Sequence, residues 1–157
     1  PENIETKLQA ITPKSTPYEI LEIRPYRIHQ RIIENYRVGR ILFAGDAAHL
    51  NSPSGGMGMN GGIHDAWNLT EKLSKVWKGE AGMELLDLYT RQRQPIAKEQ
   101  ILLQAHQNLT RMQERDASKR RSELSRLQQI ANDPVKARAH LLKSSMIEGL
   151  RRSAEIE

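Results

Sequence analysis

The strongest constraint on the fold of this chain is an apolar run that ends in a Gly-Asp pair and leads into a glycine-rich loop. The run Val38–Ala44 is almost wholly apolar and stops at Gly45, the pattern of a strand covered on both faces. Five glycines then fall between positions 55 and 62. From Asn60 the apolar residues recur at intervals of three and four, which predicts an amphipathic helix to about Lys78. A strand, a turn and a helix N-terminus are therefore expected to meet.

Such a meeting point suits a polar ligand. Asp46 follows the predicted strand, so its carboxylate is expected at the mouth of a sheet, where α/β folds bind ligands. The glycines allow positive φ and let a ligand approach the backbone without interference from Cβ atoms. The amides of about 58–62 are expected to point outward unpaired at the positive end of the helix dipole, and Pro53 stiffens the loop. A glycine-rich turn that binds no ligand is the alternative.

The order of residues makes the pattern more specific. Gly-Asp-Ala-Ala-His occupies 45–49, and Pro53, a G-x-G-x-N run over 56–60 and Asp65 follow it. This order resembles the second FAD-binding motif of the class A FAD-dependent aromatic hydroxylases, the p-hydroxybenzoate hydroxylase type of flavoprotein monooxygenase. The resemblance covers roughly residues 24–105, including a segment with Tyr89, Arg93 and Pro95. Met57 departs from it, because many relatives carry Gln there.

The resemblance implies a cofactor and a set of binding residues. Asp46 of the Gly45-Asp46 pair would bind the ribityl chain of FAD. The backbone amides of Met59 and Asn60, with Gly58 beside them, would hold the flavin pyrimidine ring, and Pro53 would lie near the reactive edge of the ring. No side chain in this stretch is expected to be catalytic. The implied activity is hydroxylation of a small aromatic substrate with O₂ and NADH or NADPH.

The resemblance also implies an incomplete enzyme. No G-x-G-x-x-G follows a first strand, although that fingerprint cradles the FAD pyrophosphate in such proteins. We therefore expect a helix-dominated α/β fold that forms the C-terminal part of an FAD/NAD(P)-binding, Rossmann-like flavoprotein. Its expected parts are the end of a substrate-binding sheet (1–33), half of the FAD-binding domain (34–105) and a helical segment (106–157). The missing N-terminal part is an implied partner, and the chain alone is expected to be inactive.

The rest of the chain is predicted from local patterns. A loop is expected over 1–17, a short strand over 18–23 and an extended segment over Arg24–Ile33. His29 and Tyr26 on that segment either line an aromatic pocket or belong to a half-exposed strand. Further helices are expected from Met83 past Leu109 with a kink or break at Pro95, over Ser118–Ala131, and over Val135–Leu150 after a cap at Asp133 or Asn132. Trp67 and Trp77 are predicted to lie in the core.

Composition excludes several classes of protein. Cysteine is absent, which removes disulfides and thiolate metal sites and fits a cytoplasmic protein. No signal peptide is visible, and no stretch has the ~18–20 apolar residues of a membrane span. For Asp46, His49, His64 and Asp65 no ligand set with helical spacing emerges, so we predict no metal site. His49 is predicted to be a hydrogen-bonding turn residue.

The net charge of +5 is uneven. Residues 91–157 carry 14 Lys/Arg against 8 Asp/Glu, whereas residues 1–90 carry 10 against 11. Because acids are interleaved with the bases and no aromatic element is available to stack a nucleobase, a solvated helical surface is favoured over nucleic-acid binding. The competing functional class is a non-enzymatic basic helical interaction module, which would dimerise or bind an acidic partner. A homo-oligomer is compatible both with a flavoprotein hydroxylase and with an interaction module.

Overall fold

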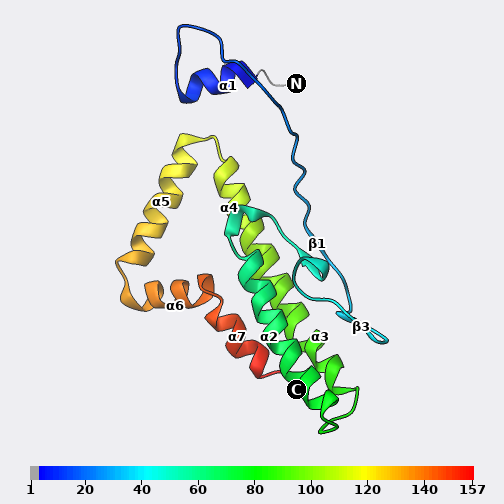
Figure 1. Cartoon of the computed structure of the whole chain (residues 1–157). Coiled ribbons are helices and arrows are strands. Elements are labelled where there is room, and N and C mark those ends of the chain that lie inside the picture. Colours follow the sequence, from blue (N-terminus) through cyan, green and yellow to red (C-terminus); the bar gives the residue numbers. More distant parts are fainter. Residues whose placement is uncertain (1–3) are drawn as a thin grey trace.

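The computed structural model describes residues 4–157, except for the side chains of Gln100 and Ile101. The molecule is an elongated set of helices with a few short strands at one side (Figure 1). The first helix stands apart from the helical body, to which an extended segment joins it. The helices are α1 (Ile4–Ile11), α2 (Gly58–Trp77), α3 (Leu85–Ile96), α4 (Leu103–Gln113), α5 (Ala117–Ala131), α6 (Pro134–Ser144) and α7 (Ile147–Ala154). This architecture confirms the predicted helix-dominated α/β class.

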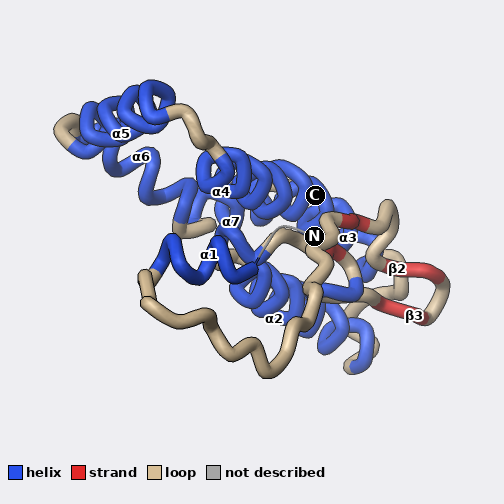
Figure 2. The backbone as a smooth tube through the Cα atoms, turned by 90° about the horizontal axis from the view of Figure 1, so that it is seen from above, coloured by secondary structure: helices blue, strands red, loops and turns tan. Residues whose placement is uncertain are grey.

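The strands form two separate antiparallel pairs, seen as short red segments in Figure 2. One pair joins β1 (Arg31–Ile32) to β4 (His49–Leu50), and the other joins β2 (Arg37–Val38) to β3 (Ile41–Leu42). The prediction of one buried strand over Val38–Ala44 is therefore wrong. Gly39 adopts a φ of +62° and reverses the chain, because glycine reaches this region without a Cβ clash. Val38 and Ile41, 60% and 61% exposed, then lie at the edge of the molecule.

The N-terminal predictions also need correction. Residues 4–11 form α1 where a loop was expected, and residues 1–3 of that predicted loop lie outside the described part of the chain. In the described structure no strand forms over 18–23, and Arg24–Ile33 contributes only β1. Leu21 and Tyr26 are 87% and 82% exposed. Extended segments need a partner strand to satisfy their backbone groups, and these residues meet none within the described chain.

Helix α2 confirms the helix predicted from apolar spacing. It ends at Trp77, and Gly79 follows with a φ of +73° and donates its amide to the Val76 carbonyl. A left-handed glycine just beyond a helix end is a common stop. The core is small: Tyr36, Ala48, Met57, Tyr89, Ala97 and Met146 make up its buried cluster. Trp67 and Trp77 are 76% and 90% exposed, so their predicted core positions are wrong in this structure.

A nearly continuous helical rod follows, and it contains the expected irregularity. Pro95 lies inside α3, and a π-helical segment, η3 (Ala97–Leu102), connects α3 to α4. Proline lacks the amide that an α-helix needs at that position, and π-turns accommodate such disruptions by one wider turn. The predicted kink or break near Pro95 therefore takes the form of a π-helical irregularity that does not interrupt the rod.

The last helices fold back toward α2 and α3 (Figure 1). Asp133 caps α6 by accepting the amides of Val135 and Lys136, as predicted. One helix over Val135–Leu150 was expected, but the chain breaks into α6 and α7. The break lies at Met146, which is buried and has a φ of +65°. The division of the chain into 1–33, 34–105 and 106–157 stays a prediction.

Candidate functional site

The Gly-Asp pair forms a tight turn at the end of the β2–β3 hairpin. A 3₁₀ turn, η1 (Gly45–Ala47), is closed by a hydrogen bond from the Ala48 amide to the Gly45 carbonyl. Gly45 has a φ of +58°, and a Cβ on it would lie 3.5 Å from the Cα of Gly62 in α2. The backbone of the turn therefore lies directly against the backbone of the helix. Asp46 is exposed beside this contact.

The glycine-rich loop reaches α2 through a second 3₁₀ turn, η2 (Pro53–Gly55). Ser52, which is fully buried, caps this turn by accepting the Ser54 amide, and Pro53 is exposed at its first position. Gly56 ends the turn with a φ of +62°. This turn packs against α4. Pro53 therefore lies in a turn that packs against α4.

Two glycines of the loop serve close packing, and one has a positive φ. Among Gly55, Gly56, Gly58, Gly61 and Gly62, only Gly56 has a positive φ. At Gly58 a Cβ would lie 2.9 Å from the side-chain oxygen of Asn51, and at Gly62 it would lie 3.3 Å from the Cα of Gly45. The expectation that these glycines permit left-handed backbone is wrong for all but Gly56.

Helix α2 begins with exposed residues and an uncapped end. Gly58, Met59 and Asn60 form its first turn, and Met59 is 76% exposed. The first amides of a helix have no acceptor within the helix, and no side chain of Met57 caps them. The Gly61 amide already donates to the Met57 carbonyl at 2.8 Å. The outward-pointing amides are therefore those of 58–60, a narrower set than the predicted 58–62.

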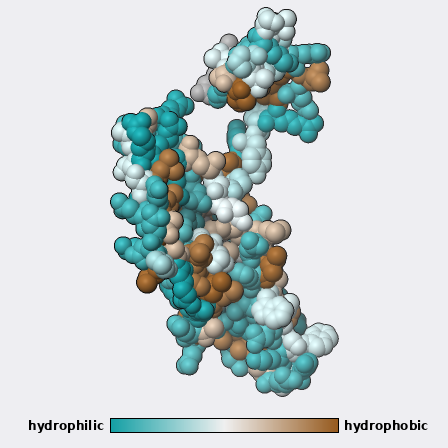
Figure 3. All heavy atoms as spheres, turned by 90° about the vertical axis from the view of Figure 1, so that its left-hand side faces the viewer, coloured by the Kyte–Doolittle hydropathy of each residue, from teal (hydrophilic) through white to brown (hydrophobic). Residues whose placement is uncertain are grey.

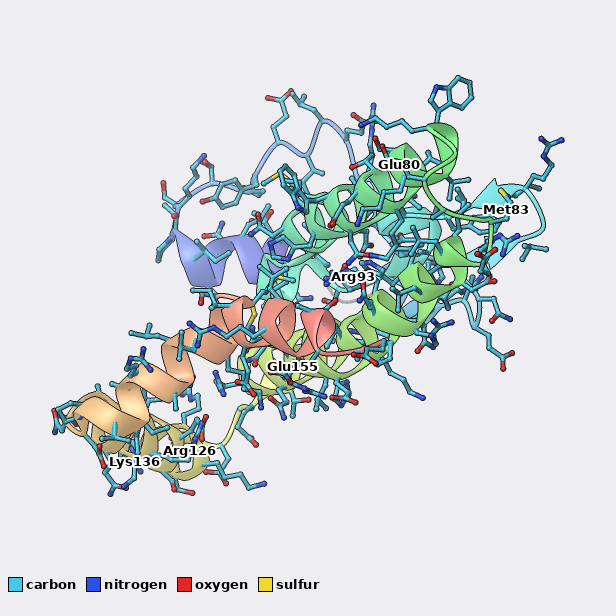
Figure 4. The ribbon with its side chains drawn as sticks, turned by 90° about the horizontal axis from the view of Figure 1, so that it is seen from below. Glu80, Met83, Arg93, Arg126, Lys136 and Glu155 are labelled. Carbon is cyan, nitrogen blue, oxygen red and sulfur yellow. The ribbon has the colours of Figure 1, made fainter. Side chains whose placement is uncertain are left out.

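A buried carboxylate holds the turn to the helices. Asp65 of α2 is fully buried; its Oδ2 accepts the Gly45 amide at 3.1 Å and lies 2.5 Å from Nε2 of His49. Its Oδ1 accepts Nε of Arg93 from α3 at 2.8 Å. We call Gly45, His49, Asp65 and Arg93 the Asp65 cluster. Figure 4 shows Arg93 in the middle of the helices. The cluster fixes the Gly-Asp turn against α2 and α3.

The charges of the cluster support one another. Burial alone would raise the pKa of Asp65, but the hydrogen bond from His49 and the positive charge of Arg93 hold it below the ordinary value for aspartate. Burial raises the pKa values of Tyr36 and Tyr89, and the negative charge of Asp65 adds to the effect. The tyrosines therefore stay neutral. Tyr89 donates its hydroxyl to the Phe43 carbonyl at 2.8 Å, which ties α3 to the strand side of the turn.

Sequence reasoning found some of this arrangement and missed the rest. His49 was predicted to be a hydrogen-bonding turn residue; its contact with Asp65 confirms the hydrogen bonding, but it lies in strand β4 and not in a turn. Arg93 was noted only as part of the resemblance, and its ion pair with Asp65 spans 28 positions. No group of three or more metal-binding side chains gathers among the described residues.

The Gly45-Asp46 turn, the uncapped start of α2 and the Asp65 cluster all lie in the part of the chain that matches a known family. Residues 1–103 match the family described as FAD binding domain. The chain belongs to this family, and FAD is the family's cofactor.

Two relatives illustrate the match. The chain is 35% identical over 139 residues to para-nitrophenol 4-monooxygenase of Pseudomonas sp. (strain WBC-3), which covers 88% of this chain and 34% of that enzyme. The crystal structure of p-nitrophenol 4-monooxygenase PnpA from Pseudomonas putida DLL-E4 superposes with a TM-score of 0.74 at 31% identity. That superposition covers 96% of this chain and 38% of PnpA.

A third relative was solved with its ligands. The ternary complex of aklavinone-11 hydroxylase with FAD and aklavinone has a TM-score of 0.54 at 33% identity, over 66% of this chain and 20% of that one. The chain thus spans about a third or less of the length of the curated relatives it matches. In the described structure, no helix combines the length and apolarity needed to cross a bilayer.

Proposed function

We propose that this chain supplies one half of the flavin site of an FAD-dependent monooxygenase that hydroxylates a small aromatic substrate with NADH or NADPH and O₂. The observation that carries the proposal is the contact between the Gly45-Asp46 turn and the uncapped start of α2. An exposed carboxylate and a row of free amides there offer hydrogen-bond acceptors and donors on one surface. When bound, FAD would supply the electron transfer and oxygen activation, which the protein side chains cannot.

Each predicted residue has a role that suits its surroundings. Asp46 is exposed and would accept hydrogen bonds from the ribityl hydroxyls. The amides of Gly58, Met59 and Asn60 would donate to the pyrimidine end of the ring. The positive end of the helix dipole favours negative charge there. Pro53 would lie toward the reactive edge. Gly45 lies against Gly62 of α2, and its positive φ would strain any side chain placed there.

The Asp65 cluster contributes by positioning. It holds the Gly45 amide and the first turns of α2 through one carboxylate, so the acceptor at Asp46 and the donors at 58–60 keep a fixed separation. A preorganised site binds its ligand without first ordering a loop. The cluster is buried and is not offered as a group that touches the flavin.

The remaining parts of the proposal rest on the comparisons and on composition. The matched enzymes are monooxygenases and hydroxylases of aromatic compounds, and the alternative of a basic helical interaction module finds no support among them. The relatives are much longer than this chain, which supports a missing N-terminal part as its partner. A cytoplasmic location and a homo-oligomeric state complete the proposal; the absence of cysteine fits the first.

The proposal is tested by titrating ¹⁵N-labelled chain with FAD and following the backbone amide resonances. We expect weak binding that shifts the amides of 45–46 and 58–60. Asp46→Ala should weaken binding about tenfold or more, because a hydrogen bond to a charged group contributes about 1.5–3 kcal/mol. Glu80→Ala, in the exposed turn after α2, is the matched control and should leave the titration unchanged. Shifts confined to α4 and α5 would refute the proposed site.

A further inference from the structure

The positive charge of the chain is concentrated in the hairpin of α5 and α6. Residues 117–144, which form this hairpin, hold 7 Lys/Arg and 2 Asp/Glu, whereas all other residues together hold 17 of each. The two acids, Glu123 and Asp133, already form ion pairs with neighbouring basic side chains. Four further basic side chains of the hairpin form no ion pair within the described part of the chain: Arg120, Arg121, Arg138 and Lys143. The hairpin therefore presents positive charge that this chain does not neutralise.

An apolar groove lies beside this charge. Helix α5 leaves α4 at an angle (Figure 1), and the two helices border a cavity of about 970 Å³, which we call the α4–α5 groove. Its apolar part is lined by Leu103, Leu124 and Leu127, of which Leu103 and Leu124 are 49% and 65% exposed. Figure 3, which looks onto the side of the molecule that carries α5 and α6, shows brown hydrophobic patches framed by teal hydrophilic surface. Exposed apolar surface with a polar rim marks an interaction site.

The rim of the α4–α5 groove is mainly basic. Glu123 accepts Arg111 at 3.0 Å, which joins α5 to α4, and Glu114 is the other acid on the rim. The basic rim residues outnumber these two acids: Arg111, Lys119, Arg120 and Arg126. Neither α5 nor α6 contains a buried residue, and helices in proteins gain most of their stability by packing an apolar face. The groove therefore suits an occupant that is apolar on one side and acidic beside it.

Shape and composition select among acidic partners. A helix that lies on a membrane buries its apolar face in a planar headgroup layer, whereas Leu124 and Leu127 line a groove. Binding to single-stranded nucleic acid relies on aromatic side chains that stack bases, and residues 117–144 contain no Phe, Tyr or Trp. A second copy of this chain would bring the same excess of positive charge. An amphipathic helix fits best, because it places apolar anchors in a groove and polar side chains along the rim.

We propose that the α4–α5 groove is the docking site for an acidic amphipathic helix of a partner protein. The apolar face of that helix packs on Leu103, Leu124 and Leu127, and its carboxylates pair with the basic rim. Charge complementarity of this kind sets the partner and speeds association. The groove adds an interaction surface to the proposed flavoprotein, and the inference does not depend on FAD.

The test uses the whole chain and a fluorescent synthetic peptide of about four helical turns. The peptide carries leucines at spacings of three and four with glutamates beside them, and fluorescence anisotropy follows its binding. We expect saturable binding that weakens roughly tenfold or more between about 0.05 and 0.5 M salt, because salt screens exposed charges. A peptide with lysines in place of the glutamates should bind roughly tenfold more weakly or not at all.

Matched variants locate the site. Leu124→Gln should weaken peptide binding about fivefold or more, because an apolar contact in the groove is lost. Leu141→Gln on α6 is its control, since Leu141 is 63% exposed and lies outside the groove. Arg120→Gln should weaken binding about threefold at low salt, and more than Arg138→Gln, which removes one charge from α6. Circular dichroism checks that every variant keeps its helix content.

Each remaining outcome overturns the proposal. These are absence of binding, equal binding of the lysine peptide, and equal responses to Leu124→Gln and Leu141→Gln. Vesicles that contain phosphatidylglycerol and a single-stranded DNA oligonucleotide are measured beside the peptide. Tighter binding of either would assign the positive charge to a membrane or to nucleic acid instead. The flavin titration follows residues 45–46 and 58–60, so its result and the result for the groove are independent.

Discussion

The Asp65 cluster and the α5–α6 pair hold their parts of the chain together in opposite ways. The cluster joins a turn and two helices through one buried carboxylate. Neither α5 nor α6, both described in full, contains a buried residue. The two helices pack on each other with side chains that are at most half-buried, beside caps and surface ion pairs. Buried polar networks lose much when one member is removed, whereas exposed pairs contribute little. The site should therefore be rigid and sensitive to mutation, and the tail tolerant.

The largest expected effect comes from Asp65→Asn. The substitution removes the negative charge that pairs with the buried Arg93, and breaking a buried ion pair in this way costs about 3–5 kcal/mol. Urea denaturation followed by circular dichroism measures the free energy of unfolding. Asp87→Asn is the control, because Asp87 pairs with Arg37 at the surface and is half exposed; its loss should stay below about 1 kcal/mol. Equal losses for the two variants would contradict the comparison.

The native chain and the Asp65→Asn variant can also be compared as a function of pH. The pKa of Asp65 lies below 3.8 in the folded chain and near that value when unfolded. Its stabilising contribution is therefore complete above pH 3.8 and is lost as the pH falls through the folded value. Below about pH 4 the unfolding free energy of the native chain should fall more steeply than that of Asp65→Asn. Parallel pH profiles would show that the carboxylate is not held ionised by its neighbours.

A smaller and local effect is expected from Asp133→Ala. The substitution removes the cap of α6, which typically costs about 1 kcal/mol. Because α6 has few buried contacts, amide exchange should accelerate in α6 and stay unchanged in α2 and α3. Asp116→Ala provides a second cap removal, at α5, where Asp116 accepts the amides of Ser118 and Lys119. Faster exchange at the Asp65 cluster in either variant would show that the tail stabilises the site.

The smallest effect is expected from Glu123→Gln. Glu123 pairs with Arg126 and Arg111 at 2.8 and 3.0 Å on the surface between α4 and α5. Exposed pairs contribute about 0.2–1 kcal/mol, and salt screens them. The unfolding free energy should change within that range, and the difference should vanish at high salt. A larger, salt-independent loss would mean that the α4–α5 contact is a packed interface.

The elements that sequence predicted well are those set by local chemistry. Helix α2 followed from its apolar period, and Asp133 was one of two predicted caps, with Asn132 as the other. The irregularity after Pro95 followed from a missing donor. These interactions connect residues within a turn or two of each other. Their residue types and spacing alone carry the information.

The predictions that were wrong involve contacts that sequence spacing does not encode. Val38–Ala44 looked like a buried strand, but the turn at Gly39 and the missing neighbours make it an exposed hairpin. Trp67 and Trp77 have the spacing of core residues, yet nothing in the described chain covers them. Within the candidate site, the helix that contains 58–60 was predictable from its apolar spacing. The sheet expected before Asp46 is only a two-residue hairpin pair, and the ion pair of Arg93 with Asp65 was not foreseen. Pairing across 28 residues depends on how α2 and α3 pack.

The wider turn of η3 fixes the orientation of everything that follows it. Each α-helical residue advances the chain by about 100°, and a π-turn accommodates one residue more than a regular turn does. A further residue inserted between 97 and 102, beyond what this turn holds, would rotate α4 about its axis by roughly that angle. Helix α7, which packs against α3, would then turn away from it. Length in this short stretch should therefore be far less variable among functional sequences than the identity of its exposed side chains.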